Sequence, residues 1–377
     1  MIIQKEETLD EYMQQLAKKA AFSIGYPFAT DFNYEEIYSL FRFPLFNLGD
    51  PYMEGNYGVN SFKMEREVID FFADLFRAPK NNYSGYITSG GSESNLYGLY
   101  MARELYPDGI LYYSSESHYS VPKAARLLNI TAVEVCSGKN GEIDYDDLLH
   151  MMKQNRHLPA IIVANIGTTM KEAKDDIPKI KSILQELLIE SHYIHCDAAL
   201  SGAYLPLLEK DAAFDFANGV DSIACSGHKF IGSPIPCGIV VVKKNNKDHV
   251  SEYIPYIESV DSTITGTRNG LSSVFLWYAI RHFGRDGLLK RAEESLYLAE
   301  YTHQKLLENN INSHRNDMAI TVTFEKPSDS LCHKWQLATN SECSHMICMP
   351  GISKEKIDSF IAELANEKKY NDAVLQS

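Results

Sequence analysis

The chain has 377 residues, a length that favours one large domain joined to a smaller one. Apolar residues make up 45% of the sequence and charged residues 23%, as in ordinary globular proteins. Its 36 basic and 50 acidic residues give a net charge of −14 without any basic cluster, so binding to nucleic acid or to an anionic membrane surface is disfavoured.

Export and membrane insertion have no support in the sequence. The first twenty residues lack the apolar core of a signal peptide, and no uncharged apolar run reaches the roughly 18 residues of a membrane span. The seven cysteines are odd in number and include no C-x-x-C pair. We therefore expect a cytoplasmic protein with reduced thiols and no metal.

The first 59 residues are expected to lie outside the main sheet. Residues 1–25 have the spacing of an amphipathic helix. The apolar positions on its single face are Leu9, Tyr12, Met13 and Leu16. Residues 26–59 are irregular, rich in aromatic residues, proline and glycine, and too apolar for a free linker. We expect them to pack on the main body or on another subunit.

A helix over residues 60–76 precedes an alternation of strands and helices. The expected strands are Gly85–Thr88, Ile110–Tyr113, Thr131–Val135, Ala160–Asn165, His192–Cys196, Asp221–Cys225 and Gly238–Val242. The helical patterns between them are Asn95–Leu105, Ser120–Leu128, Tyr145–Met152 and Ile177–Ile189. Seven short strands with helical crossovers predict an α/β fold with a mostly parallel, doubly wound sheet.

The pattern changes near residue 270. Two long helices, two strands and a last helix are expected there: Ser272–Phe283, Asp286–Asn309, Met318–Phe324, His345–Met349 and Lys354–Asn366. This order predicts a small α+β C-terminal domain. The chain therefore divides into an N-terminal segment (1–59), a large domain (60–270) and a small domain (271–377).

The most informative lysine follows an apolar strand within residues 221–238. Lys229 comes just after Ser226, Gly227 and His228, and the glycines and prolines beyond it cannot continue a helix or a central strand. Ligand sites gather at such strand ends. Burial there disfavours the ammonium form, and a neutral amine can form a Schiff base with a carbonyl. The plainer alternative is a solvated surface lysine.

A glycine- and serine-rich turn follows the first strand of the alternation. Ser89, Gly90, Gly91 and Ser92 lie where a helix begins, so their hydroxyls and the free backbone N–H groups can cradle a phosphate. Neither the dinucleotide fingerprint nor the P-loop lysine is present. An ordinary capped helix start is the alternative.

Two more polar residues follow strand ends. Asp197, in H-C-D-A-A, places a carboxylate where the sheet is driest, and no arginine lies near it in sequence. Its ionised form needs a cationic partner, which a ligand could supply. His118, in S-E-S-H-Y-S, is a candidate ring for stacking or proton transfer. A helix-capping aspartate and a structural histidine are the alternatives.

Pyridoxal 5′-phosphate requires this combination of parts. Lys229 would hold the cofactor as a Schiff base, Asp197 would keep its pyridine nitrogen protonated and His118 would stack on its ring. The residues expected to bind its phosphate are Ser89, Gly90, Gly91, Ser92, Ser226 and His228.

With these motifs the chain resembles the group II pyridoxal-phosphate decarboxylases, in the branch of bacterial histidine decarboxylases and plant serine decarboxylases. The motifs appear in the family's order: N-L-G-D-P-Y (47–52), N-Y-G-V-N-S (56–61), S-G-Y-I-T-S-G-G-S-E-S-N (84–95), S-H-Y-S (117–120), N-I-G-T-T (165–169), H-C-D-A-A (195–199), S-G-H-K (226–229) and T-I-T-G-T-R-N-G (263–270). Ser92 and Ser94 depart from the threonine and glycine typical of relatives, and the hydroxyl at position 92 is kept.

The resemblance implies fold type I, a homodimer with active sites at the subunit boundary, and carbon dioxide release from an L-amino acid. It further implies that Thr169 and Ala199 contact the cofactor and that Gly266 and Thr267 reach the neighbour's phosphate site.

A tyrosine on a mobile loop of the partner subunit is implicated in larger family members. Tyr256 lies in the corresponding stretch, I-P-Y-I-E-S, and Tyr253 is the second choice. It would complete the reaction after carbon dioxide leaves, when a proton returns to the α-carbon. Simple packing is the alternative role for Tyr256.

Alternative functions for this protein differ in reaction or in substrate. An aminotransferase or a carbon–carbon lyase would use the same cofactor, with Arg315 as the candidate carboxylate-binding arginine of a transaminase. An interaction protein is disfavoured because Lys229, Asp197 and His118 are all retained, and a nicotinamide oxidoreductase because the fingerprint is missing. We expect L-histidine as substrate and L-serine as the alternative, in a pocket built from residues 26–27, residues 48–57 and the partner's loop.

Overall fold

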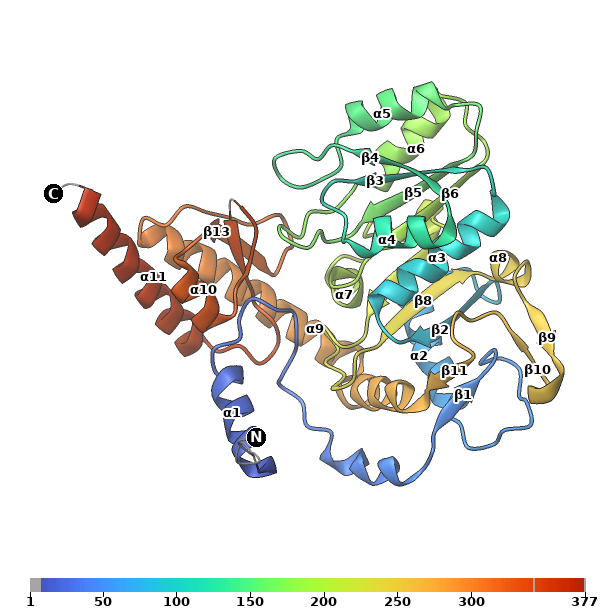
Figure 1. Ribbon diagram of the computed structural model, residues 1–377, viewed down its shortest axis with the longest axis horizontal. Coiled ribbons are helices and arrows are strands. Elements are labelled where there is room, and N and C mark those ends of the chain that lie inside the picture. Colours follow the sequence, from blue (N-terminus) through green and yellow to red (C-terminus); the bar gives the residue numbers. More distant parts are fainter. Residues whose placement is uncertain (1–7, 342, 376–377) are drawn as a thin grey trace, which may run out of the picture.

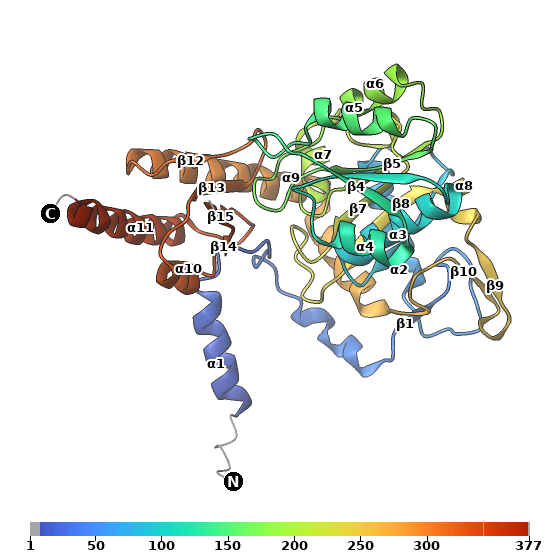
Figure 2. The same cartoon turned by 45° about the horizontal axis from the view of Figure 1, so that its top comes forward.

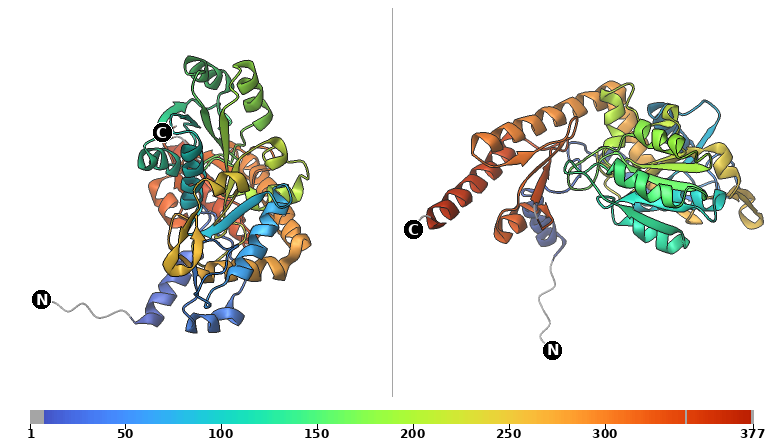
Figure 3. Two further views of the ribbon diagram at one scale, coloured as in Figure 1. Left: turned by 90° about the vertical axis from the view of Figure 1, so that its right-hand side faces the viewer. Right: turned by 90° about the horizontal axis from the view of Figure 1, so that it is seen from above.

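The computed structural model describes residues 8–341 and 343–375. A large α/β unit and a smaller α+β unit lie side by side, and the helix α9 (Gly270–Glu308) runs from one to the other (Figures 1 and 3). The N-terminal arm, residues 8–59, runs along the lower side of both units in the view of Figure 1. In the described part of the chain, no helix is long and apolar enough to cross a membrane.

The large unit is built on one seven-stranded sheet. Its strands are β2 (Tyr83–Thr88), β3 (Ile110–Ser114), β4 (Thr131–Val135), β5 (Ala160–Asn165), β6 (His192–Asp197), β7 (Ser222–Ser226) and β8 (Gly238–Lys243). Their spatial order is β2-β8-β7-β6-β5-β3-β4. All seven predicted strands are present, with ends within two residues of the prediction. Only the pairs made by β8 are antiparallel, because a loop rather than a crossover helix joins β7 to β8.

Both faces of this sheet are covered by helices. Alternate residues of β5 divide between two cores, with Ile162 in one and Ile161 and Val163 in the other. This double burial explains why the strands read as continuous apolar runs. The helices of this unit are α2 (Phe62–Leu75), α3 (Gly91–Leu105), α4 (Ser120–Leu128), α5 (Tyr145–Gln154), α6 (Ile177–Glu186), α7 (Leu205–Leu208) and α8 (Lys244–Asp248), with 3-10 turns η2 (Ser201–Ala203) and η3 (Phe216–Asn218).

The smaller unit packs the second half of α9 and two further helices on a four-stranded antiparallel sheet. Its elements are β12 (Ser313–His314), β13 (Thr321–Glu325), α10 (Asp329–Trp335), β14 (Ala338–Thr339), β15 (Cys343–Ile347) and α11 (Lys354–Leu375). Gly284, at φ 60° and ψ −177°, interrupts α9 between the two helices predicted from the sequence. The domain boundary near residue 270 stays a prediction, since α9 packs on both units.

The N-terminal segment is partly ordered into short elements. The helix α1 (Leu9–Ala20) stands away from the body with its apolar stripe exposed (Figures 1 and 2), and residues 1–7 of the predicted helix lie outside the described residues. Residues 26–59, expected to be irregular, contain η1 (Glu35–Arg42) and β1 (Phe46–Leu48). The strand β1 pairs with β11 (Thr267–Asn269). A hairpin of β9 (Glu252–Ile254), η4 (Pro255–Ile257) and β10 (Ser259–Asp261) lies at the far edge of the large unit.

A buried ion pair ties this segment to the sheet. Glu65 of α2 and Arg268 of β11 are 0% and 4% exposed and form a direct ion pair. Glu65 also accepts hydrogen bonds from the Ile87 amide (2.8 Å) and from Asn47 Nδ2 (2.6 Å), while Arg268 donates to the Gly49 carbonyl at 2.8 Å. Four segments therefore meet at one carboxylate.

We expect Glu65→Gln to lower the free energy of unfolding by about 3–5 kcal/mol, because it leaves the Arg268 charge buried without a counter-ion. Urea unfolding followed by circular dichroism would measure the change. The matched control is Asp74→Asn on the same helix, where an exposed pair with Arg285 at 3.0 Å is broken and the change should stay below about 1 kcal/mol. Equal effects of the two variants would contradict this role of Glu65.

Candidate active site

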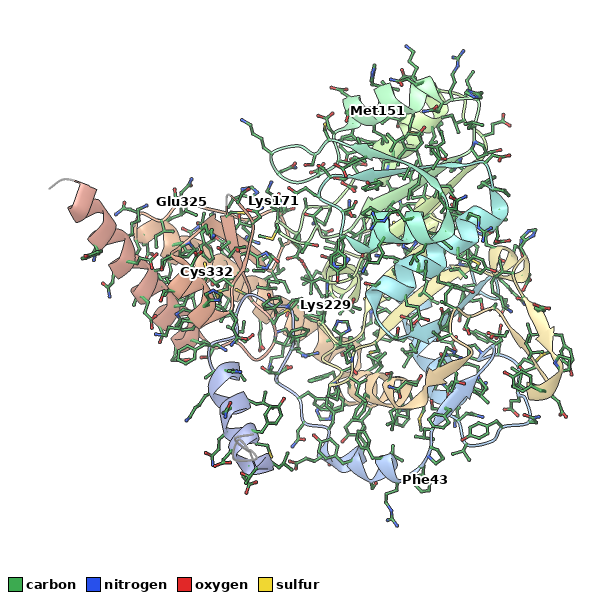
Figure 4. The ribbon with its side chains drawn as sticks, in the orientation of Figure 1. Phe43, Met151, Lys171, Lys229, Glu325 and Cys332 are labelled. Atoms are coloured by element: carbon green, nitrogen blue, oxygen red, sulfur yellow. The ribbon has the colours of Figure 1, made fainter. Side chains whose placement is uncertain are left out.

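A cavity of about 660 Å³ lies at the carboxyl ends of β3, β5 and β6, between the large and small units. Figure 4 labels Lys229, which lies between the two units. Six of the predicted site residues line the cavity: His118, Thr169, Asp197, Ala199, His228 and Lys229. Further lining residues come from loops of the large unit, from the N-terminal arm (residues 25–28) and from the small unit, so three parts of the chain enclose one space.

Lys229 enters the cavity from the loop that follows β7. Burial lowers the pKa of its amine, against the opposing influence of Asp197, Cys225 and Glu172. Within the described chain the amine has neither an ion pair nor a hydrogen bond. A lysine in this state loses its proton more readily than a surface lysine and is available as a nucleophile.

Asp197 ends β6 and is 6% exposed. Its Oδ2 accepts a hydrogen bond from Asn95 Nδ2 at 2.7 Å, and its Oδ1 accepts one from the Ala199 amide at 3.2 Å. No lysine, arginine or histidine of the described residues forms an ion pair with it. A buried carboxylate with spare acceptor capacity that faces a cavity is suited to a cationic ligand group.

His118 follows β3 and lines the same cavity. Its Nδ1 accepts a hydrogen bond from the Ser120 hydroxyl at 2.8 Å, so the other ring nitrogen carries the proton. Burial lowers the pKa of His118 more than Asp197 raises it, and Lys229 and Lys123 lower it further. The ring is therefore neutral near pH 7 and can pack on a flat ligand.

The predicted phosphate loop adjoins this cavity without lining it. Ser89 and Ser92 line a neighbouring pocket of about 260 Å³ together with Ser120, Lys123 and Thr265. A Cβ added to Gly91 would lie 2.7 Å from Ser226 Oγ, so only glycine lets the start of α3 approach the end of β7 so closely. At Gly90 an added Cβ would meet nothing within 4 Å.

Several of the residues predicted to bind the phosphate already form hydrogen bonds within the protein. Ser89 gives its amide (2.8 Å) and its hydroxyl (2.5 Å) to the Glu93 carboxylate. The amide of Ser226, the last residue of β7, donates to the Ala199 carbonyl at 3.0 Å, which links the end of β7 to the cavity wall. His228 is fixed by its Nδ1, which donates to the Cys237 carbonyl at 2.7 Å, and burial lowers its pKa.

The predicted tyrosine is not near the cavity of its own chain. Tyr256 lies on η4 with 80% of its surface exposed, and its carbonyl accepts a hydrogen bond from Asn56 Nδ2 at 2.8 Å. The hairpin that carries it lies on the side of the large unit away from the small unit (Figures 1 and 2). Tyr253 of the same hairpin is 58% exposed.

Three residues at the site were not singled out from the sequence. Ser117 lines the cavity, and its hydroxyl oxygen is buried with no hydrogen-bond partner in the described chain. Asn95 and His195 contact each other behind Asp197, with His195 Nε2 at 3.0 Å from Asn95 Oδ1. The period-two spacing of His195 and Asp197 places both side chains on one face of β6 and could have drawn attention to His195, but it gives no signal for its contact with Asn95.

His195 has a strongly depressed pKa, and this predicts a pH dependence of stability. Burial lowers the pKa of His195 to about 4, although Asp197 raises it somewhat. Between about pH 6.5 and 4 the unfolded chain therefore binds a proton that the folded chain does not, so stability falls as the pH is lowered. We expect this histidine to account for about 2–3 kcal/mol lost by pH 4.5.

The measurement is urea unfolding at several pH values for the natural protein and for His195→Gln. The variant should show a shallower loss of stability across this window, because glutamine does not titrate. Parallel pH profiles for the two proteins would show that His195 takes no part in the loss.

Comparisons with known proteins agree with this arrangement. The model of the pyridoxal-dependent decarboxylase conserved domain matches residues 59–322, more than half of the chain. A histidine decarboxylase from Mesorhizobium japonicum is 45% identical over 97% of this chain and 99% of its own length. Serine decarboxylase 3 from Oryza sativa subsp. japonica is 42% identical over 91% of this chain and 78% of its own.

A solved structure supports the fold. L-Methionine decarboxylase from Streptomyces sp. 590 superposes with a TM-score of 0.88 at 26% identity, covering 95% of this chain and 94% of that one. The expected fold type I, with a large sheet of seven strands and a small C-terminal unit, is therefore confirmed.

The residues present fit pyridoxal phosphate. Asp197 offers the cavity a carboxylate with no ion-pair partner in the described chain, and Lys229 offers an amine with a lowered pKa. The close approach of Gly91 to Ser226 brings the N-terminus of α3, a natural phosphate-binding element, against the same wall. The chain belongs to the pyridoxal-dependent decarboxylase family and is a pyridoxal-phosphate-dependent amino acid decarboxylase of fold type I.

Proposed function

We propose that this protein decarboxylates L-histidine to histamine and carbon dioxide. The single observation that carries the proposal is the convergence of Lys229, Asp197 and His118 on one cavity whose remaining walls have room for a side chain larger than that of serine. Relatives named histidine decarboxylase match at 42–45% identity in several bacteria, and those named serine decarboxylase match at 41–42%.

Each residue of the site has a distinct part in this proposal. The Lys229 amine would hold the cofactor, the Asp197 carboxylate would accept a hydrogen bond from its protonated ring nitrogen, and the His118 ring would pack on its face. Residues 89–92 at the N-terminus of α3, with Ser226 and His228, would hold the phosphate. When bound, pyridoxal phosphate supplies a ring that accepts the electron pair left on the α-carbon. Thr169 and Ala199 complete the walls that position it.

The cavity favours loss of the substrate carboxylate. No arginine lines it within the described chain, so the carboxylate is not clamped by a guanidinium group, as it would be in a transaminase. Arg315, the candidate for that role, instead donates to Glu300 Oε2 at 2.5 Å and to the Ala319 carbonyl at 3.0 Å. A carboxylate held without a counter-ion in a dry site is destabilised relative to neutral carbon dioxide.

The walls suit a flat, partly polar side chain. Tyr26, Phe28, Met170 and Ile347 supply apolar surface around the Lys229 amine. Glu116, whose carboxylate accepts a hydrogen bond from Lys171 Nζ at 3.2 Å, lines the same cavity and can meet a polar atom of an imidazole. L-Serine is the second candidate, supported by the 42% identity to a serine decarboxylase, but it would leave the aromatic part of the wall unfilled.

We further propose that the protein works as a homodimer with a partner's tyrosine at each site. The N-terminal arm exposes a dense set of large apolar side chains, as does the hairpin that carries Tyr256. These exposed residues are Leu9, Tyr12, Met13, Leu16, Tyr38, Phe41, Phe43, Phe46, Tyr253 and Tyr256. Tyr256 of one chain would return the proton to the α-carbon in the cavity of the other.

The substrate is tested by measuring carbon dioxide release from each of the twenty L-amino acids with the purified, cofactor-loaded protein. We expect kcat/KM for histidine to exceed that for serine by at least about 100-fold, since the site must pair the polar atoms of imidazole. Greater kcat/KM with serine would replace histidine in the proposal.

The proposed residue roles are tested in the same assay. Lys229→Ala should lose the cofactor's visible absorption band and all measurable activity, and Asp197→Asn should lower kcat by about 100-fold or more. Arg315→Lys is the matched control. It should keep near-natural activity if the protein is a decarboxylase, whereas it should lose activity if the protein is a transaminase that binds the substrate carboxylate through Arg315. Formation of an oxo acid without carbon dioxide would contradict decarboxylation.

The exchange of Tyr256 between subunits is tested by mixing two inactive variants. Lys229→Ala and Tyr256→Phe chains, unfolded and refolded together in equal amounts, should recover about a quarter of the natural activity. Half of the random dimers are mixed, and one site in each mixed dimer has both residues. Refolding either variant alone is the control, and a mixture no more active than the variants alone would show that Tyr256 does not act across the subunit boundary.

A further inference from the structure

A buried chain of hydrogen bonds runs behind the cavity from β7 to Asp197. Ser222 Oγ lies 2.7 Å from His195 Nδ1, His195 Nε2 lies 3.0 Å from Asn95 Oδ1, and Asn95 Nδ2 lies 2.7 Å from Asp197 Oδ2. Asn95 and His195 are 2% and 0% exposed. Neither touches the cavity, since neither is among the residues that line it in the described chain.

The donor and acceptor of each hydrogen bond in this series follow from its last member, the Asp197 carboxylate. An ionised carboxylate only accepts, so Asn95 must present its NH2 group to Asp197 and its carbonyl oxygen to His195. His195 Nε2 must then carry the proton, and Nδ1 must accept the Ser222 hydroxyl. The neutral state of His195 that this requires agrees with its burial. Donors therefore point uniformly from Ser222 towards Asp197.

The Asn95 amide also reaches the opposite wall of the cavity. Its Nδ2 lies 3.1 Å from Ser120 Oγ, and the Ser120 hydroxyl lies 2.8 Å from His118 Nδ1. The two protons of one amide thus serve Asp197 and the residue that holds His118. Rotation of this amide would disturb both walls at once.

The helix α3 is shaped to admit this arrangement. Gly98 lies one turn beyond Asn95, and a Cβ added there would come within 2.3 Å of His195 Nδ1. His195 fills the space that the missing side chain leaves, with its ring braced between α3 and β7. The amide of Asn95 is therefore fixed by packing as well as by hydrogen bonds.

We propose that Asn95 is a positioning residue that orients Asp197 and His118 together, and that His195 locks the Asn95 amide in the required orientation. This inference rests on the proposed roles of Asp197 and His118 at the cofactor. It predicts that the loss of one amide weakens cofactor binding and alters the cofactor's spectrum, although the amide touches neither cofactor nor substrate.

The test titrates pyridoxal 5′-phosphate into the apoenzyme of each variant and follows protein fluorescence and visible absorption. Asn95→Ala should raise the Kd for the cofactor about 10- to 100-fold, as expected for the loss of a hydrogen bond to a charged group, and should shift its absorption band. In the loaded enzyme kcat should fall by a similar factor, with KM for the amino acid changed less than about threefold.

Two variants of His195 provide an independent test if Asn95→Ala does not fold. His195→Gln keeps an N–H donor for Asn95 Oδ1 and should stay within about threefold of the natural Kd, whereas His195→Leu removes that donor and should resemble Asn95→Ala. The matched control is Tyr97→Phe on the same helix, which removes a buried hydroxyl near Ser262 (3.5 Å) and should leave Kd and spectrum unchanged.

Three results would overturn the inference: an unchanged Kd and spectrum in Asn95→Ala, equal behaviour of the glutamine and leucine variants, or a control as impaired as Asn95→Ala. The Kd of Asp197→Asn and of His118→Ala for the cofactor, measured in the same way, distinguishes failure of the inference on Asn95 from failure of the proposed function. If these two variants weaken cofactor binding and Asn95→Ala does not, only the inference on Asn95 fails. If they too bind normally, the proposed roles of Asp197 and His118 fail.

Discussion

The constraint on which the site depends is the burial of the Asp197 carboxylate without a cation from the described chain. A buried charge of this kind is strongly disfavoured unless hydrogen bonds and a counter-ion compensate it. The protein supplies two hydrogen bonds, from Asn95 and from the Ala199 amide, and leaves the cavity side open. In the proposed arrangement the cofactor's protonated ring nitrogen would complete this balance, so cofactor binding is expected to stabilise the fold.

The sheet brings the candidate catalytic side chains together because the carboxyl ends of its parallel strands lie at one edge. His118 follows β3, Asp197 ends β6 and Lys229 follows β7, and these parallel strands all end on the same side of the sheet. The antiparallel strand β8 then requires a return loop instead of a crossover helix, and Lys229 lies on that loop. Its position next to the other two residues is thus a consequence of topology.

Much of this could be predicted from the sequence, and the exceptions have physical reasons. The seven strands were predictable because both faces of the sheet are buried, and their ends marked His118, Asp197 and Lys229. The contact of Asn95 with His195 was not, because the two lie 100 residues apart and meet only through packing of α3 on the sheet. The two- and three-residue strands such as β1 and β11 carry too little periodicity to be recognised.

The residues with proposed roles in the reaction and much of the cavity wall lie in different parts of the sequence. Lys229, Asp197 and His118 lie within residues 59–322, which match the family model, whereas residues 25–28, Ala338, His345 and Ile347 of the cavity lie outside it. His345 joins these parts, since its ring nitrogens each lie 3.1 Å from a carbonyl, one of Met170 and one of Gly25. A wall built from the N-terminal arm and the small unit can change its shape without moving Asp197 or Lys229, because neither belongs to those segments. If the proposed site roles hold, the decarboxylation chemistry would stay fixed while the N-terminal arm and the small unit set the choice of amino acid.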